Sequence, residues 1–297
     1  MRYSRTRARD IDHPFYGVAA HNVDLTDLVQ LAYAYGHRAH DTVAISHGTA
    51  ARLLGLPLPR RLELEQVVHV TRLDAGRAPR GRGICGHRWQ LGASAARYEL
   101  MLAPSSGEHL PLRILTPIAT AVTLAGELSL DDLVAVLDAC VEGSDRSFLA
   151  VGRNLIRNRT GAARFERAAR LVRDGVRSRA ETLTRLMIAR AGFPEPSVAQ
   201  PVVTPLGVLH PDLMWERFGV LVEYEGDGHR VSRRQFRHDI TRFDAFVDAG
   251  LSPIRATADD VYDDPRRLLG VIERRLRERG WRPHSRWRLR VPATVER

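Results

Sequence analysis

The sequence predicts an α/β fold that ends in an α/β sandwich built on a mixed sheet. Near the C-terminus the elements follow the order helix, three strands in a meander, helix, strand and helix. The predicted helices carry their own start and stop signals, and turn residues separate the short β-rich runs. A sheet with hairpin-connected and crossover-connected strands is mixed, and it needs helices to cover its apolar faces.

The first half of the sandwich follows from local chemistry. Residues 178–192 form a helix, because Ser178 can cap its first turn and Gly192 can end it. Three strands come next, with the turns PLG and ERFG between them. We expect these strands at residues 198–204, 208–215 and 220–226.

The second half of the sandwich begins with a long helix from Ser232 to Gly250. Its predicted apolar stripe follows steps of four, three and four and consists of Phe236, Ile240, Phe243 and Val247. A short strand, PIRAT, follows this helix. In the last helix Asp264 caps, Pro265 takes the first position, and Leu268, Ile272 and Leu276 face a core.

The region before residue 145 reads as a mixed α/β domain without a visible catalytic constellation. Helical spacing alternates there with two β-rich runs, QVVHVTRL and ICGHRWQL, separated by a loop rich in Gly, Arg and Pro. Ser46 and Gly55 bound a short helix, and Ser129 caps a later one. The predicted helices cover 24–36, 46–55, 116–126 and 129–143.

Composition shifts divide the chain into four parts. Residues 1–145 form the N-terminal domain, and 146–177 form an arginine-rich helical linker. Residues 178–281 form the sandwich domain, and 282–297 form a basic tail. For any single arginine of the linker, a solvated helix face is the simpler explanation.

Charge and cysteine content narrow the function classes. The 297 residues carry a formal net charge of +10, and every basic residue besides histidine is an arginine. Guanidinium groups form bidentate pairs with phosphate, which favours an anionic polymer as partner, although a merely soluble basic surface is an equal alternative. Two cysteines are too few for a disulfide framework. No apolar run is long enough to span a membrane, so we expect a cytoplasmic protein without a membrane partner.

Three acids in the run HPDLMWERFGVLVEYEGDGH are predicted to share one face of the sheet. Successive strand side chains alternate, so Glu223 and Glu225 point to the same side. The neighbouring strand carries Asp212, which would bring a third carboxylate within several ångströms. Such a cluster repels itself unless a cation such as Mg²⁺ or Mn²⁺ lies within it. An exposed edge hairpin is the alternative.

Four more residues are candidates for the same site, each with a structural alternative. Glu181 lies on the preceding helix, where it is also the partner of Ser178 in a capping box. His229 follows the glutamate strand, where it could simply end a turn. Asp239 and Arg242 lie three apart on the next helix, where they could pair on a solvated face.

The candidate site residues lie in a region, residues 178–281, that resembles a known family. Glu181, HPDLMW, VEYEGDGH and HDITRFDAFVDAGLSPIRAT together resemble the Vsr-like domain family, related to the very short patch repair endonuclease, within the PD-(D/E)xK restriction-endonuclease superfamily. The resemblance implies a restriction-endonuclease-like sandwich that hydrolyses phosphodiester bonds with a divalent metal. Glu181 then matches the helix acid, Asp212 the strand aspartate and Glu223 the third acid.

One position departs from the superfamily pattern. The superfamily lysine would fall where this chain has Glu225, and the chain contains no lysine. Members of the Vsr-like group commonly have an acid there and a histidine after the glycines, as at His229. The general base is therefore open between His229, Glu225 and a metal-bound hydroxide. Asp239 and Arg242 match the group's D-x-x-R helix, which implies that they support the site or contact phosphate.

The N-terminal run AISHGTAARLLGLPLP, with VVHVT after it, is similar to actinobacterial proteins related to the AbiEi family of type IV antitoxins. The winged helix with which those proteins often begin is not evident here.

Two functions follow as expectations. The first is a metal-dependent DNA endonuclease in repair or defence, in which Asp212, Glu223 and Glu225 hold Mg²⁺ or Mn²⁺ and His229 relays a proton. The second is a non-catalytic regulator that keeps a nuclease fold to bind DNA or a toxin-like protein. In the first, phosphates are positioned by helix arginines: Arg233, Arg234 and Arg237.

Overall fold

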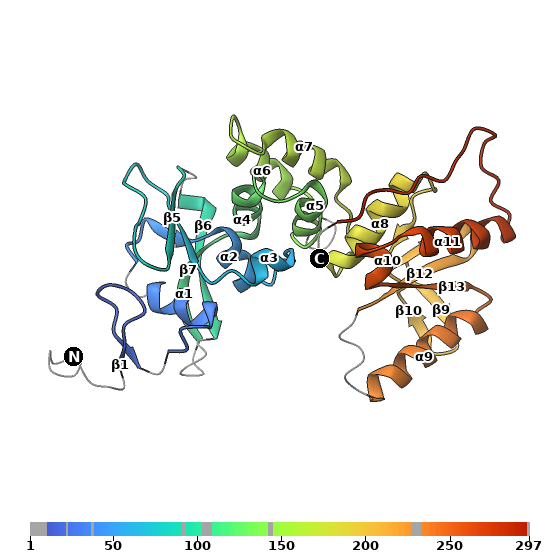
Figure 1. Cartoon of the computed structure of the whole chain (residues 1–297), viewed down its shortest axis with the longest axis horizontal. Coiled ribbons are helices and arrows are strands. Elements are labelled where there is room, and N and C mark those ends of the chain that lie inside the picture. Colours follow the sequence, from blue (N-terminus) through green and yellow to red (C-terminus); the bar gives the residue numbers. More distant parts are fainter. Residues whose placement is uncertain are drawn as a thin grey trace. The chain divides into compact units, whose positions relative to one another are not determined.

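The computed structural model of the chain describes residues 11–21, 23–36, 39–90, 93–102, 109–141, 145–226 and 233–295 (Figure 1). These residues fall into two compact units, the first ending at Arg170 and the second continuing from Leu171. Each unit contains helices and a sheet with both parallel and antiparallel strand pairs, which confirms the predicted α/β class. Within the described residues, no helix is both long enough and apolar enough to span a membrane.

The first unit is built on a five-stranded mixed sheet with the order β5-β4-β3-β7-β6. Parallel pairs join β4 to β5 and β3 to β7, and antiparallel pairs join β3 to β4 and β6 to β7. The sequence predicted only β4 and β5 of these five strands. The bounds are β3 Val43–Ile45, β4 Val68–Arg72, β5 Ile84–Arg88, β6 Ala96–Leu102 and β7 His109–Leu115.

Short elements surround this sheet and complete its core. The apolar side of α1 packs on β3, β4 and β7 through buried residues such as Leu28 and Ala32. Both α2 and α4 were predicted, and α2 lies against α4 and β4. The bounds are β1 Ile11–Asp12, β2 Ala20–His21, α1 Leu28–Gly36, α2 His47–Leu53, α3 Arg60–Glu63 and α4 Pro117–Leu124.

The arginine-rich stretch is not a separate linker, contrary to the prediction for residues 146–177. Residues 145–170 belong to the first unit, because α6 packs on α4 and buries Ile156. A Cβ on Gly152 would lie 2.4 Å from the ring of Phe165, so this glycine allows α6 and α7 to approach each other closely. The arginines lie on amphipathic helices whose other face is core. The bounds are α5 Leu130–Asp138, α6 Phe148–Ile156 and α7 Ala162–Leu171.

The second unit holds a four-stranded mixed sheet with the order β13-β12-β11-β8, as predicted for its class. The pairs β8 to β11 and β11 to β12 are antiparallel, whereas β12 and β13 are parallel. The crossover between the parallel strands is α9. The bounds are β8 Ser197–Val198, β11 Leu213–Trp215, β12 Val220–Glu225, α9 Arg233–Asp248 and β13 Ser252–Thr257.

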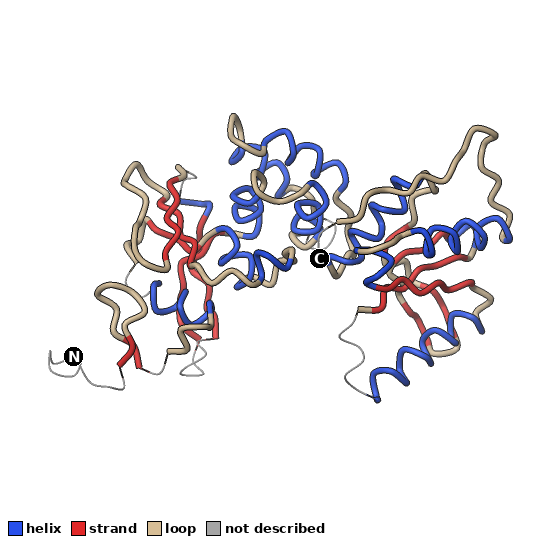
Figure 2. The backbone as a smooth tube through the Cα atoms, in the orientation of Figure 1, coloured by secondary structure: helices blue, strands red, loops and turns tan. Residues whose placement is uncertain are grey.

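Helices cover both faces of this sheet (Figure 2). On one face, α8 and α11 pack on Val222 and Ile254, and on the other face Phe246 of α9 packs on Met214 and Leu221. Ser178 caps α8 and Gly192 ends it with a φ of 93°, as predicted. The bounds are α8 Arg179–Ala191, α10 Ala258–Tyr262 and α11 Arg266–Glu278, with a 3₁₀ turn at Glu216–Phe218.

Two of the predicted strands are each divided in two. β9 (Val202–Thr204) and β10 (Gly207–Leu209) form a separate two-stranded ribbon, outside the four-stranded sheet. In this ribbon the side chains of Val203, Leu206 and Val208 are exposed. The strands break because the chain must turn at Pro201 and again at Pro211, and proline cannot donate to a strand ladder.

The predicted stripe of α9 is wrong at two of its positions. Ile240 and Val247 are exposed, whereas Ala245 and Phe246 are buried. Phe243 is partly buried, and the side chain of Phe236 lies outside the described residues. The predicted core face of α11 is confirmed, because Leu268, Ile272 and Leu276 are fully buried.

The predicted basic tail is part of the second unit. Trp287 and Leu289 pack against the core formed by α8, α11 and the sheet. The indole Nε1 of Trp287 donates to the carbonyl of Gly192 at 2.7 Å, and the backbone N–H of Arg290 donates to the carbonyl of Ala191. The tail therefore covers the C-terminal end of α8.

Candidate functional site

Asp212 and Glu223 lie side by side at the carboxyl-terminal end of β12. The pairing of Leu213 with Val222 puts the two acids on neighbouring positions of the hairpin. The backbone N–H of Asp212 donates to Oε1 of Glu223 at 3.1 Å, and the N–H of Tyr224 donates to Oδ2 of Asp212 at 2.7 Å. The structure thus brings together the two strand acids that the sequence singled out.

Glu181 approaches the same place from the first turn of α8. Its carboxylate accepts the N–H of Arg177 at 2.9 Å and the hydroxyl of Ser178 at 2.9 Å. Ser178 in turn accepts the N–H of Glu181, as in a capping box. Both carboxylate oxygens of Glu181 are therefore engaged in the helix cap.

Electrostatic coupling links the three acids. Burial, together with the negative charges of Glu223 and Glu181, raises the pKa of Asp212 to about 7, against the opposing effects of the Tyr224 N–H and Arg242. Burial also raises the pKa of Glu181, against the hydrogen bonds in its cap. Because a buried charge without a partner is unfavourable, Asp212 carries an unusual share of protonated form near neutral pH.

Arg242 of α9 is the cation that faces these acids. Its Nε donates to Oε2 of Glu223 at 2.8 Å, and its Nη2 donates to the carbonyl of His210. The guanidinium also lies over the ring of Phe246, 5.3 Å from the centroid. Arg242 therefore joins α9 to the acid-bearing hairpin.

Glu225 lies on the same side of β12 as Glu223, yet it has a different partner. It forms an ion pair with Nε of Arg255 on β13, at 3.0 Å, where both side chains are 38% exposed. The guanidinium of Arg255 also lies 4.4 Å from the ring centre of Phe243 on α9. Glu225 thus belongs to a second ion pair beside the acid cluster.

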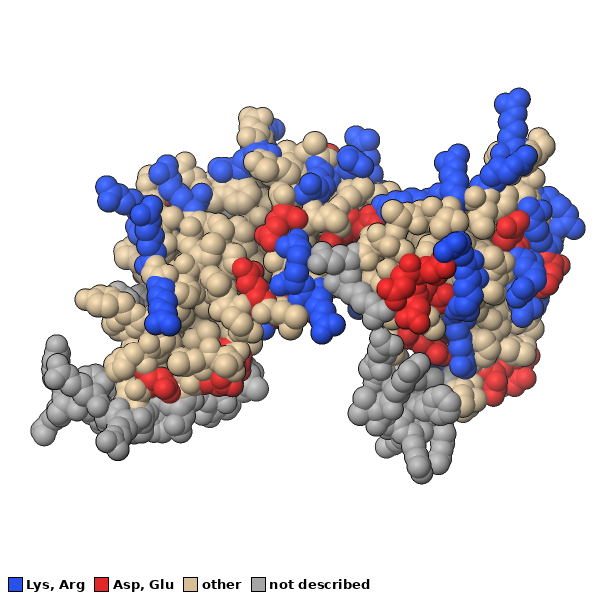
Figure 3. Space-filling model, in the orientation of Figure 1, with Lys and Arg blue, Asp and Glu red and all other residues tan. Residues whose placement is uncertain are grey.

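The side chains of the remaining predicted site residues lie outside the part of the chain that the structure describes. His229 lies outside the described residues. Four others lie on α9 with side chains outside the described part: Arg233, Arg234, Arg237 and Asp239. Acidic side chains gather on the visible face of the second unit, next to a column of arginine side chains (Figure 3).

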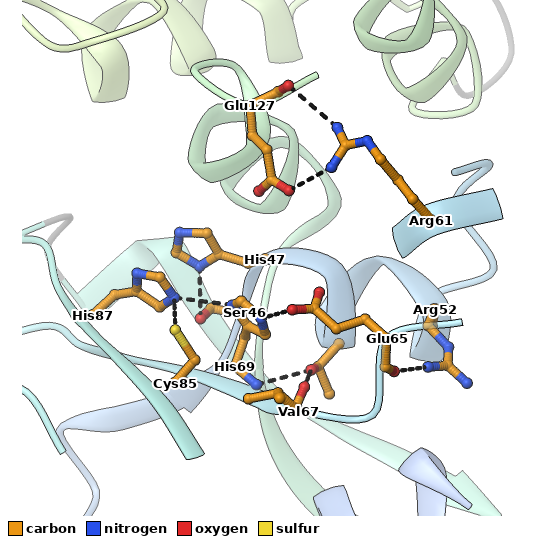
Figure 4. A network of polar contacts seen from close by, with 11 residues as sticks. Ser46, His47, Arg52, Arg61, Glu65, Val67, His69, Cys85, His87 and Glu127 are labelled. Carbon is orange, nitrogen blue, oxygen red and sulfur yellow. Dashed lines mark hydrogen bonds and ion pairs between the residues drawn. The ribbon is translucent and has the colours of Figure 1, made fainter. Parts of the chain in front are cut away.

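The structure brings together a second polar cluster, in the first unit, which the sequence analysis missed. Its three imidazoles belong to His47 at the start of α2, His69 on β4 and His87 on β5 (Figure 4). Nδ1 of His69 lies 3.0 Å from Nε2 of His87, and Nε2 of His69 lies 3.1 Å from Oε1 of Glu65. The rings of His47 and His87 stack with centroids 3.6 Å apart.

Burial and mutual repulsion keep two of these imidazoles neutral. Burial, together with the neighbouring His87 and His69, lowers the pKa of His47 to about 2. Burial, together with His69, lowers the pKa of His87 to about 4, against the opposing effect of Glu65. Neutral imidazoles retain the lone pair that a metal ion or a proton donor needs.

The two clusters differ in how closely their ligand atoms converge. Among the described residues, only the three histidines bring three ligand atoms within 4.8 Å of one another. The acid cluster does not meet that condition. Mg²⁺ does not require it, because this ion keeps several water ligands and is commonly bound through one or two carboxylates.

Comparison of the chain with family models, with curated proteins and with solved structures gave no match. The resemblance of residues 178–281 to Vsr-like domains therefore stays a prediction from motifs.

Proposed function

We propose that the second unit is a metal-dependent endonuclease that hydrolyses phosphodiester bonds in DNA, with Asp212 and Glu223 at the centre of its site. The observation that carries this proposal is the convergence of acids: Asp212 and Glu223 lie side by side and partly buried, Glu181 lies within electrostatic range of both, and their charges and burial raise the pKa of Asp212. Strongly perturbed carboxyl groups of this kind occur preferentially at functional sites. The acids also lie on the strand and helix positions that match the Vsr-like motifs.

The charge balance of the cluster supports a cation. Three carboxylates, those of Glu181, Asp212 and Glu223, lie within electrostatic range of one another, and Arg242 is the cation that opposes them at Asp212. Oδ1 of Asp212 accepts no hydrogen bond from any residue that the structure describes. A hard divalent ion at Asp212 would offset the remaining negative charge with the oxygen ligands it prefers.

The residues divide the work of such a site between holding and positioning. Asp212 and Glu223 would hold the ion, Mg²⁺ or Mn²⁺, with water in its remaining positions. The bound ion would stabilise negative charge on the phosphodiester and lower the pKa of a bound water. Arg242 fixes the carboxylate of Glu223 through its Nε, and Glu181 fixes the start of α8 beside them. The candidates for the general base are His229, Glu225 and a metal-bound hydroxide.

The positive net charge of the chain favours DNA, a polyanion, as the substrate. The net charge is +10, and all of it comes from arginine, whose guanidinium pairs with phosphate in a bidentate manner. The helix that supplies Arg242 also carries Arg233, Arg234 and Arg237 near its N-terminal end. Arginines at that position would contact the backbone of a duplex whose phosphate lies at Asp212.

The test combines metal binding with cleavage. The full chain is titrated with Mg²⁺ and Mn²⁺ in a calorimeter and incubated with supercoiled plasmid, as wild type and as Asp212→Asn. We expect metal-dependent nicking by the wild type and a loss of at least about 100-fold in Asp212→Asn, because a ligand is removed. Asp248→Asn, the same change at an exposed position of α9, is the matched control. Equal cleavage by Asp212→Asn would contradict the proposal.

A second function is favoured by the ion pairs at the site. Glu223 is held by Arg242 and Glu225 by Arg255, so two of the acids already have cationic partners. Such a site would suit a non-catalytic protein that binds DNA or a toxin-like partner. It predicts salt-sensitive DNA binding that is indifferent to EDTA and unchanged in Asp212→Asn. The plasmid assay separates the two functions directly.

A further inference from the structure

We propose that the first unit contains a transition-metal site, selective for zinc over magnesium, whose ligands are the imidazoles of His47, His69 and His87. This inference is independent of the nuclease proposal, because the histidines and the acids lie in different units. One ring nitrogen from each histidine already lies within 4.8 Å of the other two.

Distances within the cluster fit a shared ion. Two nitrogens bound to one tetrahedral Zn²⁺ at about 2.0 to 2.1 Å lie about 3.3 Å apart. Nδ1 of His69 and Nε2 of His87 are 3.0 Å apart, which is close to that separation. Without a metal, a single proton joins these two nitrogens. With a metal, both lone pairs face the ion, and His87 adopts its other tautomer, in which the proton is on Nδ1 rather than on Nε2.

Glu65 contacts the ring nitrogen of His69 that does not face the proposed metal ion. Nε2 of His69, the nitrogen opposite the one that faces His87, lies 3.1 Å from Oε1 of Glu65. Metal-bound histidines commonly donate their second ring N–H to a carboxylate, which fixes the tautomer and strengthens the ligand. Glu65 is therefore a positioning residue, and it would keep the lone pair of His69 on Nδ1.

Three elements of the unit meet at this point (Figure 4). His69 and His87 come from β4 and β5, which are paired in parallel, so that His69 lies opposite Cys85 and Thr71 opposite His87. His47 begins α2 with a φ of 50°, in the left-handed region that a residue with a side chain seldom adopts. The backbone at His47 is therefore strained, and in this conformation the residue points inward and is only 8% exposed.

The ligand chemistry selects the class of metal. Imidazole suits zinc and its neighbours among the divalent transition metals, whereas Mg²⁺ prefers oxygen ligands. The Sγ of Cys85 lies 3.5 Å from Nε2 of His87 and is a candidate for a fourth ligand. Binding requires the stacked rings of His47 and His87 to rotate until both face the ion. The occupied site would tie β5, at the edge of the sheet, to β4 and α2.

The experiment uses the full chain after dialysis against a chelator. Zn²⁺ binding is measured by calorimetry, and Co²⁺ serves as a spectroscopic substitute whose visible absorption reports tetrahedral nitrogen ligation. We expect one Zn²⁺ per chain and no response of this site to Mg²⁺. His69→Gln and His87→Gln should each weaken Zn²⁺ binding by at least about 100-fold, and Glu65→Gln by about 10- to 100-fold.

His40→Gln is the matched control, because His40 is an exposed histidine of the same unit outside the cluster. It should bind Zn²⁺ as the wild type does. Circular dichroism verifies the fold of each variant, and Glu65→Gln keeps the test decisive if a histidine variant does not fold. Absence of Zn²⁺ binding in the wild type would overturn the proposal. So would binding that survives in His87→Gln but disappears in Asp212→Asn, because the ion would then lie at the acids.

Discussion

Nε of Arg242 donates to Oε2 of Glu223 at 2.8 Å, and this contact joins α9 to the hairpin that carries the acids. Both side chains are largely buried, at 24% and 15% exposure. Removing one member of a buried pair leaves the other charge without a partner, which is more unfavourable than losing a surface ion pair.

Arg242→Gln is therefore expected to lower the free energy of unfolding by about 2 to 3 kcal/mol. Arg242→Lys should recover only part of the loss, because lysine cannot reach Glu223 and the carbonyl of His210 with a planar fork. Chemical denaturation followed by circular dichroism measures both. An Arg242→Gln variant as stable as the wild type would show that the pair contributes nothing.

Stability should depend on pH through Asp212. Its carboxyl has a pKa of about 7 in the folded protein and 3.8 as its ordinary value. Between these values the folded chain keeps a proton that the unfolded chain has lost. The contribution to stability is thus fully present below about pH 4 and is lost as the pH rises through 7.

Asp212→Asn mimics the protonated carboxyl and should remove this dependence. In the presence of a chelator, we expect the variant to be more stable than the wild type at pH 8, by on the order of 3 kcal/mol, and similar to it at pH 4. Urea denaturation at the two pH values measures the difference, with Asp248→Asn as the control. Parallel pH profiles for wild type and Asp212→Asn would refute the expectation.

Glu181→Gln separates a role in the helix cap from a role as a ligand. Because both oxygens of Glu181 are occupied by Arg177 and Ser178, we expect the variant to lose about 1 kcal/mol of stability and to keep cleavage within a few-fold of the wild type. Thermal denaturation and the plasmid assay measure the two effects. A loss of cleavage as large as that of Asp212→Asn would instead make Glu181 a ligand.

The tail should stabilise the second unit. Trp287 packs on Phe193 and Trp281, with ring centroids 5.6 and 5.0 Å away, and donates to the carbonyl of Gly192. Trp287→Ala is expected to lower the free energy of unfolding by about 2 kcal/mol, because it removes a half-buried ring and a hydrogen bond. Trp287→Phe should lose about half as much. Chemical denaturation followed by circular dichroism tests both, and a neutral Trp287→Ala would mean that the tail does not contribute.

Local sequence signals predicted three of the α-helices described in the second unit, α8, α9 and α11, but not the short α10. Ser178 and Gly192 set the two ends of α8, and the spacing of the apolar residues sets the buried face of α11. These effects depend on residues within one or two turns of each other, so the local sequence is enough to predict them. The prediction failed where tertiary packing decides. The buried side of α9 runs through Phe246 rather than through Val247, because Met214 and Leu221 lie beneath it.

Sites are harder to predict than helices, because they depend on register. Asp212 and Glu223 were found from side-chain alternation within a hairpin, which is a short-range rule. The histidine cluster was missed, because it needs the parallel pairing of β4 with β5 and the inward turn of His47, and neither leaves a local pattern. The signal that was available was a histidine in each of the two β-rich runs VVHVT and ICGHR.

The β9–β10 ribbon bears on how the protein behaves at high concentration. It presents Val203 on β9, Leu206 in the turn and Val208 on β10 with 80%, 54% and 58% of their surface exposed. Within the described part of the chain, each of the two strands pairs with the other alone and leaves one edge without a strand partner. Open edges with apolar side chains invite pairing between molecules. Colloidal instability should therefore begin at this ribbon, and a charged residue at position 203 is the substitution that would best keep concentrated samples monodisperse.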